Sequence, residues 1–154
     1  MSSSKQEKGA GEAISVDELV AKAGELKDHI DTLNATLNIY LNQYREIQLA
    51  SETLRNLPQG NLQGYLVLDR LSSALVPANI SDSWFNSVLV NLGLGYYVKA
   101  DRDKAVEVLS KRVQELEKVI NTLQAQQKAA VEQYLSIQRL INQVIGAQQS
   151  KSQK

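Results

Sequence analysis

The fold is decided by residues 16–54, VDELVAKAGELKDHIDTLNATLNIYLNQYREIQLASETL, in which apolar residues recur every seven positions. The seam residues are Val16, Ala23, Ile30, Leu37 and Tyr44 at one position of the repeat, and Leu19, Leu26, Leu33, Tyr40, Ile47 and Leu54 at the other. A repeat of seven keeps a narrow apolar stripe on one side of a helix, and a second helix must cover that stripe. The segment therefore predicts one helix of a coiled coil. An ordinary helical bundle, whose helices have similar seams, is the alternative.

A second ladder with the same period occupies residues 106–144. Its seam residues are Val106, Val113, Ile120, Gln127, Tyr134 and Ile141, alternating with Leu109, Leu116, Leu123, Ala130, Ile137 and Val144. Because the two ladders are nearly equal in length and flank a short centre, we expect the helices to fold back on each other. The predicted fold class is α+β: a long antiparallel α-helical coiled-coil hairpin with two β-hairpins between the helices.

Capping signals set the expected limits of both helices. Ser15 and Glu18 match a capping box at the start of the first helix, and Pro58 stops that helix. Asp101 has the character of an N-cap, and Gly146 is a plausible stop for the second helix. The predicted organisation is a disordered tail at 1–13, the first helix at 14–57, two β-hairpins at 58–100, the second helix at 101–146 and a disordered tail at 147–154.

The centre of the chain contains four short runs with strand character. These runs are GYLVLDR at 64–70, SALVPANI at 73–80, SVLVNL at 87–92 and GYYVKA at 95–100. Leu71-Ser72 is expected to join the first two strands, and the tight Gly93-Leu94-Gly95 connection the last two. Pro77 lacks an N–H donor, which predicts an edge position for the second strand. Four strands this short cannot bury a core alone, so the centre is expected to need partner chains.

Composition excludes several classes of function. The 17 Lys and Arg residues balance the 17 Asp and Glu residues, so the chain lacks the basic surplus that usually drives nucleic-acid binding. The absence of cysteine excludes disulfides, thiolate metal sites and cysteine nucleophiles, and it fits a cytoplasmic location. No secretory signal or membrane-spanning run is recognisable. His29 is the sole histidine and has no evident catalytic or metal-binding partner, so we expect no enzyme activity, metal or cofactor.

Apolar residues crowd the beginning of the first helix and the end of the second. They are Ile14, Val16, Leu19 and Val20 in the first helix, and Leu140, Ile141, Val144 and Ile145 in the second. Antiparallel pairing would bring these two groups to one tip, and four of them (Ile14, Val20, Leu140 and Ile145) fall outside the seam. These apolar residues, which helix pairing does not need, predict a binding surface at the tip. Packing of the helix ends, or contact with another subunit's tip, is the alternative.

Aromatic residues outside the strands allow two interpretations. Trp84 and Phe85 lie between the expected hairpins, where they could anchor a subunit contact or pack locally. Tyr40, Tyr44 and Tyr134 occupy seam positions, where packing is the expected role and each hydroxyl needs a hydrogen-bond partner.

The order helix, two β-hairpins, helix resembles the α-class subunit of prefoldin in its archaeal form, over about residues 15–146. The resemblance rests on Leu66-Val67-Leu68 in the first hairpin, on VLVNLGLGYYV at 88–98 in the second, and on residues 103–112 at the entry to the second helix. The first hairpin departs from the family pattern Leu-Val-Pro-Leu-Gly, because this chain reads LVLDR at 66–70 and lacks the glycine turn.

This resemblance implies an ATP-independent chaperone that holds unfolded client proteins. Two α and four β subunits would join into a hexamer through their hairpins, and the coiled-coil tips would deliver clients to a group II chaperonin. The eight apolar tip residues named above would bind clients. Subunit assembly would use Leu66, Leu68, Val88, Val90, Leu92, Tyr96 and Val98. The alternative is a structural coiled-coil adaptor that binds one defined partner. Neither nucleic acid nor a membrane is expected as a partner.

Overall fold

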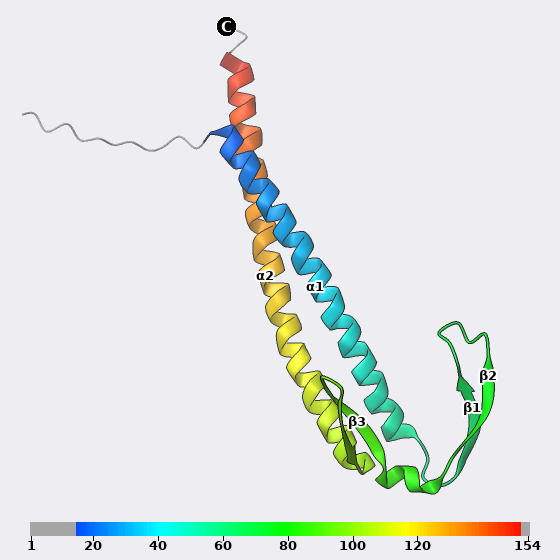
Figure 1. Cartoon of the computed structure of the whole chain (residues 1–154). Helices are drawn as coiled ribbons and strands as arrows, with labels where there is room; N and C mark the ends of the chain where they lie inside the picture. Colours follow the sequence, from blue (N-terminus) through cyan, green and yellow to red (C-terminus); the bar gives the residue numbers. More distant parts are fainter. Residues whose placement is uncertain (1–14, 152–154) are drawn as a thin grey trace, which may run out of the picture. The chain divides into compact units, whose positions relative to one another are not determined.

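The computed structural model describes residues 15–151, with side chains to residue 147 (Figure 1). The elements are α1 (Val16–Asn56), β1 (Leu62–Val67), β2 (Leu75–Ile80), the 3₁₀ helix η1 (Asp82–Asn86), β3 (Val88–Gly93), β4 (Tyr96–Ala100) and α2 (Arg102–Lys151). Strands β1 and β2 form one antiparallel pair, and β3 and β4 form another. The predicted fold class, two long helices with two β-hairpins between them, is therefore confirmed.

The chain divides into two compact units, and the first contains α1 up to Thr36 and α2 from Leu123 onward. The helices run antiparallel in this unit. Leu19 and Ala23 of α1 pack against Ile137 of α2, and the half-buried side chains of Leu26, Tyr134 and Ile141 surround them. Further along the same unit, the Gln127 side-chain amide donates a hydrogen bond to the Asn34 side-chain oxygen. This polar layer lies at a seam position of α2.

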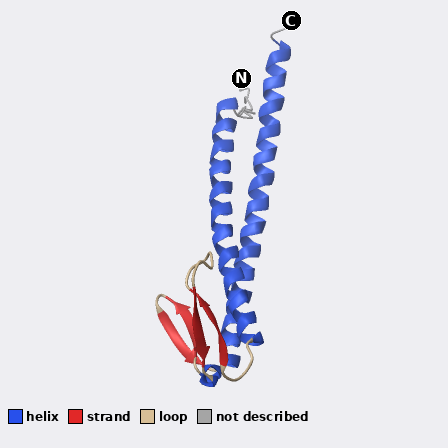
Figure 2. Ribbon diagram, turned by 90° about the vertical axis from the view of Figure 1, so that its right-hand side faces the viewer, coloured by secondary structure: helices blue, strands red, loops and turns tan. Residues whose placement is uncertain are grey.

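The second unit contains residues 37–122, with the rest of both helices and both β-hairpins (Figure 2). The helices are antiparallel here too. The Tyr44 hydroxyl donates to Glu117 Oε1 over 3.0 Å, and Arg55 Nη2 donates to Ser110 Oγ over 3.0 Å. These cross-links pair later residues of α1 with earlier residues of α2.

Burial follows the predicted ladders in both units. Every seam residue of both ladders is buried or half-buried, which confirms the heptad assignment. Ser51 extends the first ladder by one step beyond Tyr44 and is also buried. Ser51 was not predicted, because a hydroxyl residue breaks the apolar pattern, although its spacing of seven fits the repeat.

The capping groups expected at the two helix starts form hydrogen bonds, and α2 ends later than expected. Ser15 Oγ accepts from Glu18 N, and the Glu18 carboxylate accepts from Ser15 N, which completes the capping box. Asp101 Oδ1 accepts from Lys104 N over 2.7 Å as the N-cap of α2. Helix α2 continues through Gly146 to Lys151, so residues 147–151 are helical and the tail predicted from 147 is corrected. The tail predicted at 1–13 lies outside the described residues.

The strands follow the predicted order with small shifts. Strand β1 begins and ends earlier than the predicted run 64–70, and its register pairs Leu62 with Ile80 and Val67 with Leu75. In the second hairpin, Leu94 and Gly95 connect β3 and β4, and both have positive φ angles, 53° and 82°. Two consecutive left-handed residues are typical of a type I′ turn, which matches the natural strand twist.

Replacing the N-cap of α2 tests the local energetics. We expect Asp101→Ala to lower the free energy of unfolding by about 1 kcal/mol, because Lys104 N loses its acceptor. This corresponds to a fall in Tm of about 2–4 °C by circular dichroism. Asp101→Asn is the matched control, since asparagine caps equally well. Equal destabilisation by both variants would contradict the capping role.

Candidate functional surfaces

The second hairpin is attached to the helices by one small apolar core. Val90 of β3 is 3% exposed and packs with Ala105 and Leu109 of α2, which are 0% and 8% exposed. Val88 is half-buried and packs against the same cluster. Val90 is therefore a core residue of this chain, which corrects its predicted place on an assembly surface. Val88 belongs largely to this core as well.

The other predicted assembly residues are exposed on the hairpins. They are Leu66, Leu68, Leu92, Tyr96 and Val98. Leu66 lies within β1, whereas Leu68 lies just beyond its end. These side chains are available to another chain, so the structure is compatible with their predicted role.

The β1–β2 hairpin has one face that is entirely apolar. Residues directly opposite each other on an antiparallel pair share a face. On this face the pairs are Leu62 with Ile80, Gly64 with Ala78, and Leu66 with Val76. No residue of β1 or β2 is buried. A two-stranded ribbon with an uncovered apolar face is not stable by itself in water, so this face is a candidate contact surface.

The β1–β2 turn is organised by a single carboxylate, Asp69, that was not among the predicted site residues. The Asp69 carboxylate accepts backbone hydrogen bonds from Leu71, Ser73 and Ala74 over distances of 2.8–3.2 Å. These donors, with Ser73 foremost, hold the pKa of Asp69 below its ordinary value of 3.8. Asp69 thereby replaces the glycine turn that the sequence lacks. An Asp two residues before a loop amide, the spacing of an Asx turn, is the available sequence signal.

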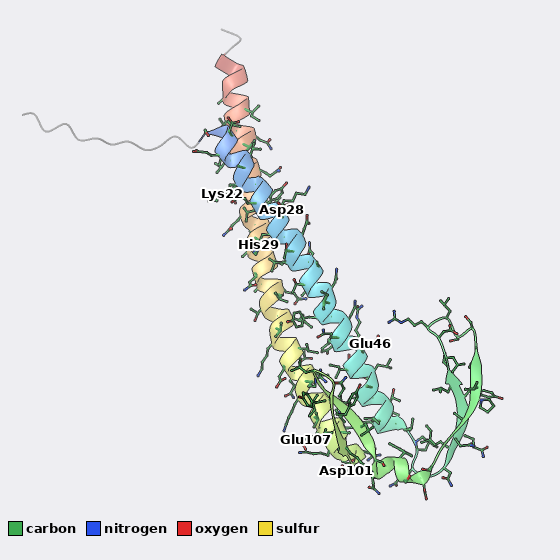
Figure 3. The ribbon with its side chains drawn as sticks, viewed as in Figure 1. Lys22, Asp28, His29, Glu46, Asp101 and Glu107 are labelled. Atoms are coloured by element: carbon green, nitrogen blue, oxygen red, sulfur yellow. The ribbon has the colours of Figure 1, made fainter. Side chains whose placement is uncertain are left out.

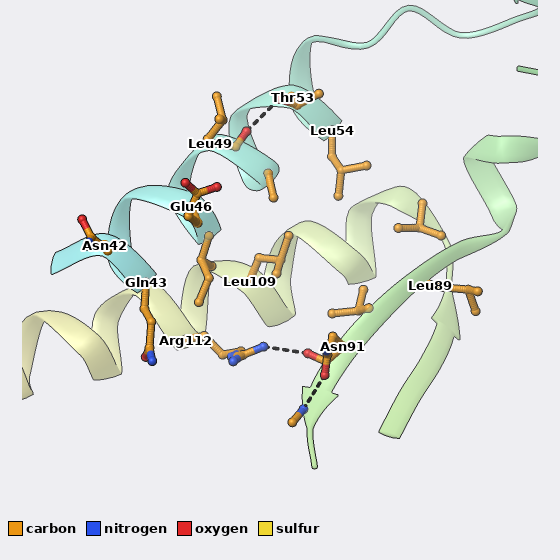
Figure 4. A pocket seen from close by; sticks show the side chains of 15 residues that line it. Asn42, Gln43, Glu46, Leu49, Thr53, Leu54, Leu89, Asn91, Leu109 and Arg112 are labelled. Carbon is orange, nitrogen blue, oxygen red and sulfur yellow. Dashed lines mark hydrogen bonds between the residues drawn. The ribbon is translucent and has the colours of Figure 1, made fainter. Parts of the chain in front are cut away.

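The β3–β4 turn is held from two directions. Asn91 Oδ1 accepts from Gly93 N over 2.7 Å, and Arg112 Nη1 of α2 donates to the Asn91 carbonyl oxygen over 2.6 Å (Figure 4). The strand pairing is irregular between Asn91 and Gly93, where the register shifts. The Arg112 contact thus satisfies a carbonyl group beside this bulge and fixes the hairpin against α2.

A groove runs between α1, β3 and α2 in the second unit. Its volume is about 990 Å³, and Figure 4 shows the side chains that line it. Leu49, Ala50 and Leu54 of α1 contribute apolar side chains along one wall, and Leu109 of α2 contributes another. Glu46 and Arg112 are the charged residues that line the groove. A groove of this composition fits apolar side chains of a neighbouring chain better than it fits a small charged ligand.

The predicted tip residues separate into two groups in the first unit. Leu19 is buried, Ile141 packs beside it, and Val16 and Val144 are half-buried, so these four serve the helix seam. Val20, Leu140 and Ile145 are 53%, 47% and 40% exposed. Ile14 lies outside the described residues. Figures 1 and 2 both show α2 continuing past the first residue of α1. Exposed apolar groups therefore accumulate where the seam ends.

Trp84 and Phe85 of η1 pack locally. Their rings meet edge to face with centroids 5.7 Å apart, and the Arg102 guanidinium lies 4.5 Å from the Phe85 ring centroid. Trp84 Nε1 is buried and has no hydrogen-bond partner within the described chain. The local-packing interpretation accounts for the contacts of both rings, while a subunit contact stays a prediction.

The remaining polar candidates have ordinary structural environments. The Tyr44 hydroxyl is bonded to Glu117, which raises the pKa of Tyr44, and the Tyr134 hydroxyl accepts from Gln138 Nε2. His29 is exposed on α1 (Figure 3). Within residues 15–151, no cluster of three His, Asp or Glu could hold a metal ion. No helix in this part of the chain is long and apolar enough to cross a membrane.

A family model and several sequence relatives identify one family. The prefoldin-subunit family model matches residues 26–147. The prefoldin alpha subunit of Saccharolobus solfataricus is 32% identical over 131 residues, covering 85% of this chain and 88% of that protein. The prefoldin alpha subunit of Sulfurisphaera tokodaii is 30% identical over 141 residues, covering 90% and 91%. A chain of the filamentous PFD from Methanocaldococcus jannaschii, solved by cryo-EM, is 19% identical with a TM-score of 0.43, covering 82% and 95%.

The Asp69 carboxylate predicts a pH-dependent turn. Because its pKa is depressed in the folded chain, the stabilisation is present above pH 3.8 and is lost as the pH falls through the lower folded value. We expect the protection factors of the Leu71, Ser73 and Ala74 amides, which compare observed with intrinsic exchange rates, to fall in that acidic range. Hydrogen exchange measured by NMR checks this. Asp69→Asn is the control, since its amide cannot titrate, and pH-independent protection in the wild type would contradict the prediction.

Proposed function

Because this chain belongs to the prefoldin family, we propose that it is an α-type subunit of an ATP-independent chaperone. It holds unfolded proteins at the paired ends of α1 and α2 and passes them to a group II chaperonin in the cytoplasm. The observation that carries the proposal is the exposed apolar surplus of Val20, Leu140 and Ile145 at those ends. The proposed activity is binding without catalysis.

Family membership implies assembly with other prefoldin subunits, and we propose a hexamer of two α and four β subunits. The apolar face of the β1–β2 hairpin supports this, because Leu66 and its neighbours need cover from another chain. The groove beside β3 supports it as well, since its apolar lining is open on the surface of this unit.

Client binding at the arm ends is supported by the chemistry of the exposed residues. Val20, Leu140 and Ile145 are aliphatic, so they offer contact area without the directional hydrogen bonds that would select one sequence. Each exposed aliphatic side chain contributes on the order of 1 kcal/mol when a client covers it. Several arms in one assembly convert such weak contacts into useful affinity through avidity.

The client-binding proposal is tested by changing the exposed arm-end residues together. We expect Val20→Ser, Leu140→Ser and Ile145→Ser in one chain to reduce suppression of client aggregation at least about fivefold, because apolar contact area is lost on every α arm. The measurement is light scattering of a denatured protein diluted into the assembled complex. Assembly should be unchanged, as judged by size-exclusion chromatography with multi-angle scattering.

A matched control changes exposed apolar residues elsewhere on the helices. Ile39→Ser and Val119→Ser remove similar side chains that are also exposed, and they should leave client protection unchanged. Equal protection by the arm-end variant and the wild type would contradict client binding at this site. Competition between two unrelated denatured proteins separates a chaperone from an adaptor, because an adaptor with one defined partner should ignore both.

The assembly proposal is tested on the two faces of β1. We expect Leu66→Asp to abolish the complex with the β subunit, because a carboxylate would be buried without a partner on the apolar face. Gln63→Asp adds the same charge to the opposite face of the same strand and should be tolerated. Multi-angle light scattering with and without the β subunit provides the masses. A stable complex containing the Leu66→Asp chain would overturn the proposed contact face.

A further inference from the structure

The turn between β3 and β4 presents an apolar side chain in an unusual way. Leu94 is 98% exposed and has a φ of 53°, between Gly93 at 98° and Gly95 at 82°. A left-handed backbone is unfavourable for leucine, whereas glycine and asparagine adopt it readily. If this turn had only to face solvent, asparagine or glycine would be expected at this position. Leucine at position 94 is therefore unfavourable in two ways. Its backbone is left-handed, and its apolar side chain is exposed to water.

The tip that carries Leu94 is held firmly. Asn91 Oδ1 accepts from Gly93 N, and Asn91 Nδ2 lies 3.3 Å from the Tyr97 hydroxyl oxygen across the hairpin. Arg112 of α2 holds the Asn91 carbonyl oxygen. The side chain is thus presented from a fixed platform rather than from a free loop. An exposed group that is already fixed in position loses little freedom when it is covered.

The surroundings of Leu94 match the centre of a protein contact. Leu92, Tyr96 and Tyr97 are all exposed on the same hairpin. Tyrosine is enriched in such contacts, where its ring provides area and its hydroxyl a hydrogen bond. Leu94 was not among the predicted assembly residues, because a leucine between two glycines reads only as a turn.

We propose that Leu94 is an apolar anchor that inserts into an apolar cleft of a neighbouring prefoldin subunit. The inference rests on the proposed assembly and adds to it one residue that determines its strength. A subunit is favoured over an unfolded client because hydrogen bonds hold the turn that presents Leu94, and because the left-handed backbone of Leu94 is conformationally unfavourable. Such preorganisation suits one fixed complementary surface, whereas clients vary in shape.

The deciding variant is Leu94→Asn, which should separate stability from assembly. Asparagine tolerates the left-handed backbone, so we expect the Tm of the isolated chain to stay equal or to rise by about 2–4 °C. Loss of the anchor should weaken the complex with the prefoldin β subunit of the same organism at least tenfold in Kd. Leu94→Met keeps an apolar anchor and should assemble within about threefold of the wild type. Analytical ultracentrifugation measures the Kd of the complex, and differential scanning calorimetry measures the Tm of the isolated chain.

Three outcomes decide the proposal. An unchanged Kd for Leu94→Asn, with the wild type assembling normally, would overturn the anchor while leaving the proposed assembly intact. Failure of the wild type itself to bind the β subunit would overturn both. A lower Tm for Leu94→Asn would contradict the conformational argument and so overturn the reason for preferring a fixed subunit surface to a client.

Discussion

The packing of Val90 on Ala105 and Leu109 is the contact on which the organisation of the second unit depends. Ala105 is fully buried, and its single methyl group allows β3 to approach α2 closely. The same cluster includes Ile47 and Leu54 of α1, so one core joins a hairpin to both helices. With β3 fixed, Arg112 can reach the Asn91 carbonyl, and the groove beside β3 acquires its wall. Among the residues that the structure describes, no comparable core holds β1 and β2.

Sequence periodicity predicted the helices well because a heptad seam is a local property. The capping groups were predictable for the same reason, since Ser15, Glu18 and Asp101 act within one turn. Gly146 misled because glycine destabilises a helix by only about 1 kcal/mol relative to alanine, and the helix continues where its neighbours favour it. The position of Val90 was beyond prediction for a different reason. Alternation shows that Val88 and Val90 share a face, but it cannot show which face the helices cover.

Two chemically different kinds of exposed apolar surface occur in this chain. The hairpins expose leucine, valine and tyrosine on strands of fixed register, where neighbouring groups hold a defined pattern. The arm ends expose single aliphatic residues on separate helix turns, next to the last seam residues. A fixed pattern can match one complementary surface, whereas scattered aliphatic groups can contact many different chains weakly. This difference argues for assembly at the hairpins and client contact at the ends, as proposed.

The polar layer in the seam connects the pairing of the helices to the arm-end surface. Replacing Gln127 and Asn34 by apolar residues would add buried apolar area, but their hydrogen bond is satisfied in one register only. A slip of one heptad would restore most apolar seam contacts and yet displace α2 by about 10 Å along α1. The turns of α2 that carry Leu140 and Ile145 would then shift by the same distance along α1. A layer that favours one register therefore fixes where the exposed aliphatic residues of α2 lie along α1.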